Sequence, residues 1–330
     1  LLYKLRRAYE RIADHGIASP GDALKRIDSY ISEFWIERGL YPGLASVLGL
    51  LNALRQGDPD WELAHEGGIV ASLRAEIADE EELLKEAFNL LSDKSKPAFL
   101  SADQIKILRQ IRRGFQQYSY LGPALRRLSL FDLTPRQIAH ALFPENAEKA
   151  GEPHPFRGRS ISHTDIAANP YLLCEEYVPT TVKESERSNE LDRERRTDDP
   201  IDYFTIDIGL FPDEDHCEFF DDELQDVAPT GKERLRAFAV MTLREQQSQG
   251  HTYAPLRTLI DAAQSHPLFY RRQLALNEQH FLSPGHLEHF KQRLFIDEAD
   301  GERFFYLKET KHAEEVVGRL IRHLIEQPSH

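Results

Sequence analysis

The segment RLFIDEADGERFFYLKE, Arg293 to Glu309, most constrains the fold of this chain, because it predicts a β-hairpin at a defined place. Its two runs rich in apolar and aromatic residues are joined by Asp-Gly, a dipeptide that favours a tight hairpin turn. Upstream, helices are expected in KERLRAFAVMTLREQQSQ, PLRTLIDAAQ, RRQLALNEQ and PGHLEHFKQ. Downstream, KHAEEVVGRLIRHLIEQ predicts a closing helix.

This order of short helices, hairpin and helix is that of a winged helix-turn-helix, which we predict over residues 231–330. In such a domain the third helix and the hairpin usually meet DNA. Here the hairpin tip DEADGE, Asp297 to Glu302, is acidic and would repel phosphate. The module is therefore expected to be a packing or partner surface rather than a reader of the major groove. Its candidate phosphate contacts are Arg271, Arg272 and Lys291.

The rest of the chain divides into three further segments. Apolar residues at helical spacing predict a helical bundle over residues 1–97 and a second helical segment over residues 98–180. Ser101 and Thr134-Pro135 look like helix starts, because Ser and Thr favour the N-cap and proline favours the first helical position. Residues 181–230 are expected to form an acidic linker and a strand insert. Within it, KESERSNELDRERRTDD predicts a solvated helix or a disordered linker, and the alternation in DYFTIDIGLF, Asp202 to Phe211, predicts a strand.

Charge is distributed unevenly along the sequence. The formal net charge is −14, but residues 184–226 hold 17 acidic and 4 basic residues, a local net of −13 that leaves −1 for the rest. By contrast, residues 104–131 hold six Lys and Arg and no carboxylate. Because phosphate recognition depends on the local field, overall acidity does not exclude a nucleic-acid binder.

The basic segment supplies the main candidates for contacts with a DNA backbone, which are Arg109, Arg112, Arg113, Arg126 and Arg127. Phe115, Tyr118 and Tyr120 lie among them, and exposed aromatic rings can stack on unpaired bases. The alternative to DNA contact is that this basic helix docks on the acidic run of the same chain, from Asp213 to Asp226. Its aromatic residues would then lie in the core.

Composition also bears on the environment of the protein. Two cysteines, Cys174 and Cys217, fit a reducing compartment, and no apolar run is long enough to span a bilayer. No signal-peptide pattern opens the sequence. We therefore expect a cytoplasmic protein with no membrane partner. Because the chain begins at Leu1 and its single methionine is Met241, we also expect it to be a piece of a longer protein.

No catalytic signature is present in the sequence. Gly231-Lys232 lacks the spaced glycine of a phosphate-binding loop and is expected to start a helix. The cysteines and their neighbouring histidines lack metal-ligand spacing, and Cys174 is expected to be a buried thiol. A carboxylate nuclease would need acids such as Asp207 and Glu309 to converge on a divalent ion, although a capping role also explains Glu309. We predict no catalytic residue, metal or cofactor here.

Three stretches resemble the region that precedes the motor of RecD-like superfamily 1 DNA helicases. These are NPYLLCEEY, then KERLRAFAVMTLREQQSQGHTYAPLRTLIDAA with its Gly-His-Thr-Tyr block, and then FFYLKETKHAEEVVGRLIRHL. The similarity runs with gaps from Leu133 to Leu324. The Gly-Ile-Gly-Phe hairpin that follows Asn-Pro-Tyr in that family is absent here, which removes glycines able to approach phosphate. The Asn-Pro-Tyr of this chain, residues 169–171, is expected to turn and anchor the backbone.

The resemblance implies a mainly α, multi-module protein: a helical bundle, a helix-hairpin-helix-like segment over residues 98–180, a small α/β insert and a C-terminal winged helix. It further implies the non-catalytic N-terminal region of an ATP-dependent helicase that engages single-stranded or forked DNA and positions the motor. ATP and Mg would then belong to motor domains absent from this chain. Two alternatives stay open: a scaffold whose acidic insert recruits a basic protein partner, and a divalent-metal nuclease.

Overall fold

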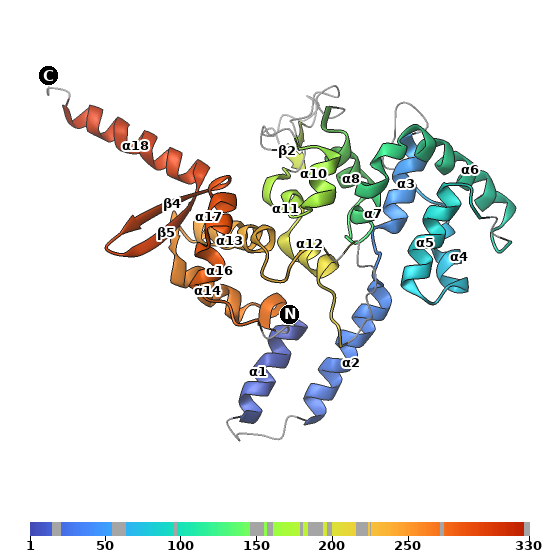
Figure 1. Cartoon of the computed structure of the whole chain (residues 1–330), viewed down its shortest axis with the longest axis horizontal. Helices are drawn as coiled ribbons and strands as arrows, with labels where there is room; N and C mark the ends of the chain where they lie inside the picture. Colours follow the sequence, from blue (N-terminus) through green and yellow to red (C-terminus); the bar gives the residue numbers. More distant parts are fainter. Residues whose placement is uncertain are drawn as a thin grey trace, which may run out of the picture. The chain divides into compact units, whose positions relative to one another are not determined.

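A computed structural model describes residues 1–14, 21–54, 64–95, 98–145, 155–156, 161–178, 181–183, 194–196, 200–215, 224, 226–270 and 274–326. Over these ranges the chain is mainly helical, with a three-stranded antiparallel sheet and a two-stranded ladder (Figure 1). Contacts between residues divide it into two compact units, Leu1–Asp226 and Val227–His330.

The first unit opens with α1 (Leu2–Asp14) and α2 (Gly21–Arg38), which pack against each other. Ile27, Ile31 and Trp35 form the buried face of α2 and share a small core with Ile208. These three residues recur every fourth position, so they form one apolar stripe along α2. This stripe anchors the helix to its neighbours.

Helix α3 (Leu44–Leu54) lies at the centre of the first unit. Its sequence LASVLGLLNAL contains no charged residue, and nearly every side chain is buried. A helix that is apolar on all sides must be surrounded by others. It contacts α4 (Ile69–Glu76), α6 (Ala102–Gln117), α7 (Gly122–Leu128) and α8 (Pro135–Leu142), and α5 (Glu80–Leu91) packs against α4 and α6 (Figure 1).

The predicted helix starts at Ser101 and Thr134 are confirmed. Each side chain accepts a hydrogen bond from the backbone N–H three residues on, at Gln104 and Gln137, and each glutamine returns the bond to the cap backbone. These capping boxes satisfy N–H groups that the first turn leaves unpaired. They fix where α6 and α8 begin.

The Asn-Pro-Tyr segment joins α10 (His163–Ala168) to α11 (Leu172–Glu176). The hydroxyl of the fully buried Tyr171 donates to Asp207 Oδ1 at 2.6 Å, and Tyr203 donates to the same oxygen at 2.8 Å. Tyr171 also stacks on Tyr203, with ring centroids 5.6 Å apart. The segment is thus anchored to the chain around residue 207, as its expected structural role requires.

The predicted strand from Asp202 to Phe211 is wrong, because these residues form helix α12 (Tyr203–Leu210). Asp202 caps the helix by accepting from the N–H of Thr205 at 2.6 Å. Ile206, Ile208 and Leu210 are all buried, and Phe204 keeps 44% of its surface exposed, so most but not all of the short element lies in the core. In so short an apolar run, alternation does not distinguish a strand from a buried helix.

Part of the acidic insert forms a short ladder. Strand β1 (Thr181–Lys183) pairs antiparallel with β2 (Glu194–Arg196). The sequence KESERSNELDRERRTDD predicts a solvated helix or a disordered linker. Lys183 and residues 194–196 instead form strand, and the remainder of that stretch lies outside the described residues. Cys217 and residues 216–223 of the acidic run also lie outside them.

The second unit contains, in order, α13 (Lys232–Ser248), β3 (Tyr253–Pro255), α14 (Leu256–Ser265), α15 (Pro267–Tyr270), α16 (Glu278–Leu282), α17 (Pro284–Lys291), β4 (Leu294–Ala299), β5 (Glu302–Leu307) and α18 (Lys308–Glu326). The predicted helix start at Gly231-Lys232 and the predicted hairpin are confirmed. Asp300 and Gly301 both have positive φ, 53° and 79°, as a two-residue turn of this kind requires.

Two features of the second unit differ from the sequence prediction. The helix expected in RRQLALNEQ does not form over residues 274–277, and α16 begins only at Glu278 because Asn277 caps it. The sheet also gains a third strand, β3, which pairs with β5 in the order β3-β5-β4. A three-residue strand that ends in proline gives almost no pattern to recognise.

Helices α3 and α6 approach closely at Gly114. A Cβ atom added there would lie 2.2 Å from the carbonyl oxygen of Leu51. Because that neighbour is backbone in a fully buried helix, it has no rotamer through which to move away. The absence of a side chain at Gly114 therefore sets both the spacing of the two helices and the rotation of α6.

We predict that Gly114→Ala lowers the free energy of unfolding of the first unit by about 1–3 kcal/mol, because the added methyl group forces α6 away from α3. Urea unfolding followed by circular dichroism measures the change. Gly21→Ala is the matched control, since a Cβ there meets nothing within 4 Å. Equal stability of the two variants would contradict the close contact.

Candidate functional site

Helix α6 presents a line of basic side chains to solvent. Leu108, Ile111 and Gly114 are buried on one face, and the opposite face carries Lys106, Arg109 and Arg113, all exposed. Residues three and four apart lie on the same side of a helix. None of these three cations forms an ion pair with a described residue. We call Lys106, Arg109 and Arg113 the α6 basic stripe; Lys106 was not singled out from sequence, although it has the same spacing.

The other arginines of the basic segment have structural roles. Arg112 donates to the carbonyls of Leu90 and Ser95, at 2.5 and 3.2 Å, and pairs with Asp93 at 2.5 Å. These bonds tie α6 to the end of α5. The guanidinium of Arg126 lies 4.7 Å from the ring centroid of Phe88.

Arg127 is the most deeply buried of the set, with 3% of its surface exposed. Its guanidinium donates to the carbonyls of Ala167 and Leu224, at 3.0 and 2.6 Å, and to Asp226 Oδ1 at 2.8 Å. The ion pair with Asp226 is one contact of the kind expected if the basic segment docks on the acidic run. The structure thus places Arg127 inside the first unit rather than on a surface that DNA can reach.

The aromatic residues of the segment also separate into two groups. Phe115 packs edge-on against Phe88, and Tyr118 packs against Phe143 at 5.2 Å between ring centroids. Tyr120 has 56% of its surface exposed and makes T-shaped contacts with Tyr118 and His163, at 6.4 and 5.2 Å between ring centroids. Tyr120 is therefore the aromatic ring near the α6 basic stripe that remains open to a ligand.

The candidate phosphate contacts of the second unit are only partly described. Arg271 and Arg272 lie outside the described residues, and Lys291 is exposed at the end of α17. Burial, with smaller effects from Arg236, Lys232 and His286, lowers the pKa of His289 to about 3. His289 is therefore neutral near pH 7, and Lys291 is the only cation that α17 contributes.

Each of the acids proposed for a metal nuclease is held in a structural contact of its own unit. Asp207 is buried in the first unit beneath two tyrosine hydroxyls. In the second unit, Arg293 donates to both oxygens of Glu309, at 3.0 and 3.1 Å, which is a structural ion pair between the segment that precedes β4 and helix α18. Among the described residues, no group of three or more His, Cys, Asp or Glu side chains is placed to hold a metal ion. Cys174 is buried, as expected.

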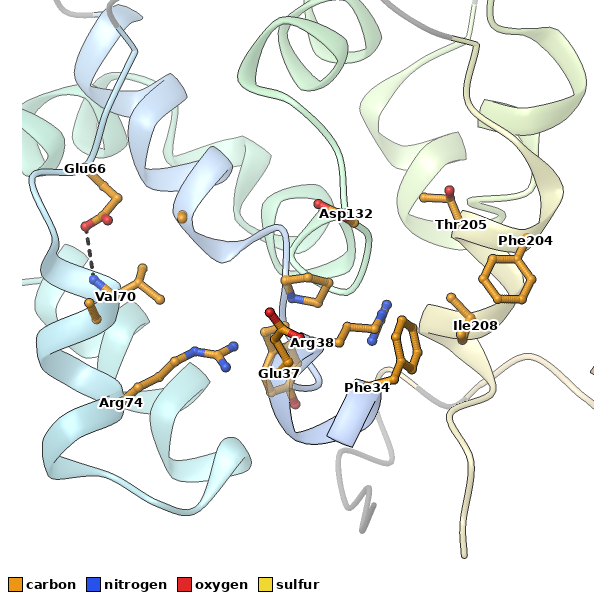
Figure 2. A pocket seen from close by; sticks show the side chains of 14 residues that line it. Phe34, Glu37, Arg38, Glu66, Val70, Arg74, Asp132, Phe204, Thr205 and Ile208 are labelled. Carbon is orange, nitrogen blue, oxygen red and sulfur yellow. Dashed lines mark hydrogen bonds between the residues drawn. The ribbon is translucent and has the colours of Figure 1, made fainter. Parts of the chain in front are cut away.

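A pocket of about 750 Å³ opens in the first unit between α2, α3, α4 and α12 (Figure 2). Phe34 and Phe204 lie on one side of it, and Glu66 and Arg74 on the other. Its two arginines already have partners: Arg38 donates to the carbonyls of Gly39 and Leu130, and Arg74 faces Glu80 at 3.4 Å.

The exposed rim of this pocket includes two carboxylates, those of Glu37 and Asp132. With apolar walls and a partly acidic rim, the pocket suits an apolar group flanked by positive charge better than it suits a phosphate. Sequence reasoning missed it, because its residues come from four separate segments that only the fold brings together.

No family model matches the chain, and no curated protein or solved structure matches it either. Among the described helices, none has the length and apolarity needed to cross a bilayer.

We predict that Arg127→Met lowers the free energy of unfolding of the first unit by about 2–4 kcal/mol, because it leaves one buried and one partly buried carbonyl without their donor. Arg113→Met removes the same charge from the surface and should change stability by less than about 0.5 kcal/mol. Urea unfolding of both variants gives the comparison. If the two substitutions were equally mild, Arg127 would not hold the unit together as described.

Proposed function

We propose that this chain is a non-catalytic, DNA-engaging region of a RecD-like helicase, and that the α6 basic stripe contacts the DNA backbone. The observation that carries the proposal is that Lys106, Arg109 and Arg113 line one exposed face without an ion pair to any described residue. Exposed cations that no carboxylate neutralises are free to replace the counterions of a phosphate chain. Tyr120, one of the next exposed residues along the chain, offers a ring on which an unpaired base can stack.

The dimensions of the stripe fit a few phosphates. At about 1.5 Å per residue, Lys106 and Arg113 are separated by roughly 10 Å along the helix axis. That length accommodates about three phosphate contacts and no extended duplex site. Three contacts imply weak, salt-sensitive binding, which suits a region that guides a strand toward a motor rather than one that reads sequence.

The second unit supports the motor-positioning part of the proposal. We interpret α13, α14, α16, α17 and the β4–β5 hairpin as a winged helix whose acidic tip disfavours insertion into the major groove of a duplex. Helix α18 then presents a stripe of side chains that are at least half exposed: Val317, Leu320, Ile321, Leu324 and Ile325. An unpartnered apolar stripe of this size marks a packing surface, which we assign to the helicase motor domains.

The test is fluorescence anisotropy of the whole chain with labelled single-stranded and forked DNA over a salt series from about 0.05 to about 0.2 M. Three single-strand contacts predict a slope of log K against log salt of about −2. We expect Arg109→Gln/Arg113→Gln to bind more weakly at low salt and to reduce the slope to about −0.7, because only one contact remains.

Lys25→Gln/Arg26→Gln is the matched control, since it removes two exposed cations from α2 of the same unit. This variant should keep the wild-type slope. Equal behaviour of the two double variants would mean that net charge, and not the α6 basic stripe, governs binding. Absence of binding at low salt would end the DNA proposal for this chain.

A second candidate, a protein-interaction scaffold, is favoured by the pocket between α2 and α12. Its apolar walls and the carboxylates of Glu37 and Asp132 would accept an apolar side chain from a basic partner. The same anisotropy series separates the two candidates, because a scaffold would not bind oligonucleotide. DNA cleavage that depends on added magnesium or manganese would instead support the nuclease alternative.

A further inference from the structure

The sheet of the second unit carries a row of aromatic rings across all three strands. Tyr253 of β3 lies directly opposite Tyr306 of β5, which in turn lies opposite Phe295 of β4. Ring centroids are 5.4 Å apart for the first pair and 6.0 Å for the second. Because directly opposed residues project from the same side of a sheet, the three rings form one continuous surface, which we call the wing aromatic row.

The row lies on the side of the sheet that faces away from the core. Successive residues of a strand point to opposite faces, and the neighbours Ala254, Phe305 and Leu294 are buried on the other side. There Phe305 packs against Phe290 of α17. Tyr253 and Phe295 keep 44% and 38% of their surface exposed. Phenylalanine rings in particular are usually buried, so two exposed rings on one face of the sheet, with Tyr306 between them, need an explanation.

One cation accompanies the row. The ammonium of Lys311, from the first turns of α18, lies 4.6 Å from the ring centroid of Tyr306 and 5.1 Å from that of Phe295. It also approaches Asp297 at 4.0 Å. Phe304, two residues from Tyr306 on β5, extends the aromatic surface on the same face of the sheet. Its ring makes a T-shaped contact with Tyr253, with centroids 5.4 Å apart. Tyr253 is the ring farthest from Lys311 along the row, and its exposed surface is open to a ligand.

The charges around the row do not favour phosphate, because Lys311 is outnumbered by the carboxylates of Asp297 and Glu314. Lys311 pairs with Asp297, and burial together with the nearby carboxylates of Glu314 and Asp297 raises the pKa of Tyr306. The acidic tip begins at Asp297, directly opposite Phe304, so its carboxylates disfavour phosphate at low salt, and salt near 1 M screens this repulsion because the Debye length falls to about 3 Å. A ligand of this surface is therefore held by ring contacts and not by phosphate attraction.

We propose that the wing aromatic row binds unpaired nucleobases by stacking, with Tyr253 as the principal ring. The inference rests on the proposed function for its ligand class, which is single-stranded DNA. It assigns a different site, in the second unit, where stacking and not charge holds the ligand. Every base offers a flat π-face, so a row of exposed rings holds single strands without reading their sequence. Binding at the row should persist in salt that suppresses binding at the α6 basic stripe.

Anisotropy with a labelled oligothymidylate at about 1 M salt, where the Debye length falls to about 3 Å, isolates the row. We expect measurable binding of the oligothymidylate and none of an abasic oligonucleotide of the same length. Tyr253→Leu should weaken binding about tenfold, because leucine keeps the apolar surface but has no ring face. Tyr253→Phe should bind as the wild type does, and Tyr30→Leu, at an exposed tyrosine of α2, should have no effect.

Photocrosslinking with 5-iodouracil in the oligonucleotide locates the contact even if Tyr253→Leu fails to fold. Crosslinks at Tyr253, Phe295 or Tyr306 are expected in the wild-type chain, and they should persist in Arg109→Gln/Arg113→Gln. The proposal is overturned if abasic and thymidylate strands bind alike, if Tyr253→Leu folds and binds as the wild type does, or if the crosslinks lie elsewhere. Loss of the crosslinks with retained salt-sensitive binding would leave the proposed function intact and refute only the row.

Discussion

The contact between α6 and α3 at Gly114 determines what the first unit can do at its surface. The carbonyl of Leu51 leaves no room for a side chain at position 114, so the two helices meet at a fixed distance and α6 has one rotation. That rotation turns Leu108 and Ile111 into the core and leaves Lys106, Arg109 and Arg113 in solvent. The α6 basic stripe is thus a consequence of core packing and does not depend on a dedicated binding loop.

Buried polar groups hold the segments around this core. Arg127 bonds two backbone carbonyls and Asp226, Asp207 accepts from two tyrosines, and Arg293 forms a two-bond ion pair with Glu309. Each brings together residues distant in sequence, and each leaves an unpaired buried group if one partner is removed. These charged groups have structural roles. Arg127, which suggested phosphate contact in the sequence, and Asp207 and Glu309, which suggested a metal site, are each engaged in the contacts just described.

Local signals in the sequence predicted local structure well. The caps at Ser101 and Thr134 and the Asp-Gly turn are set by the bonding of a few neighbouring residues, and each is where it was expected. Prediction failed where burial decides: α12 alternates like a strand but is a mostly buried helix, and β3 exists only because β5 pairs with it. The sequence could locate the basic segment, but only the packing of α6 and α7 separates Arg109 and Arg113 from Arg112, Arg126 and Arg127.

The central claim, that the exposed arginines of α6 and not the buried ones meet DNA, is tested most directly by arginine footprinting. The whole chain is treated with phenylglyoxal in the presence and absence of single-stranded DNA, and modification at each arginine is measured by mass spectrometry. The account predicts that Arg109 and Arg113 react freely and become protected by DNA, while Arg127 is unreactive in both conditions. Equal reaction of Arg109 and Arg113 with and without bound DNA would contradict it.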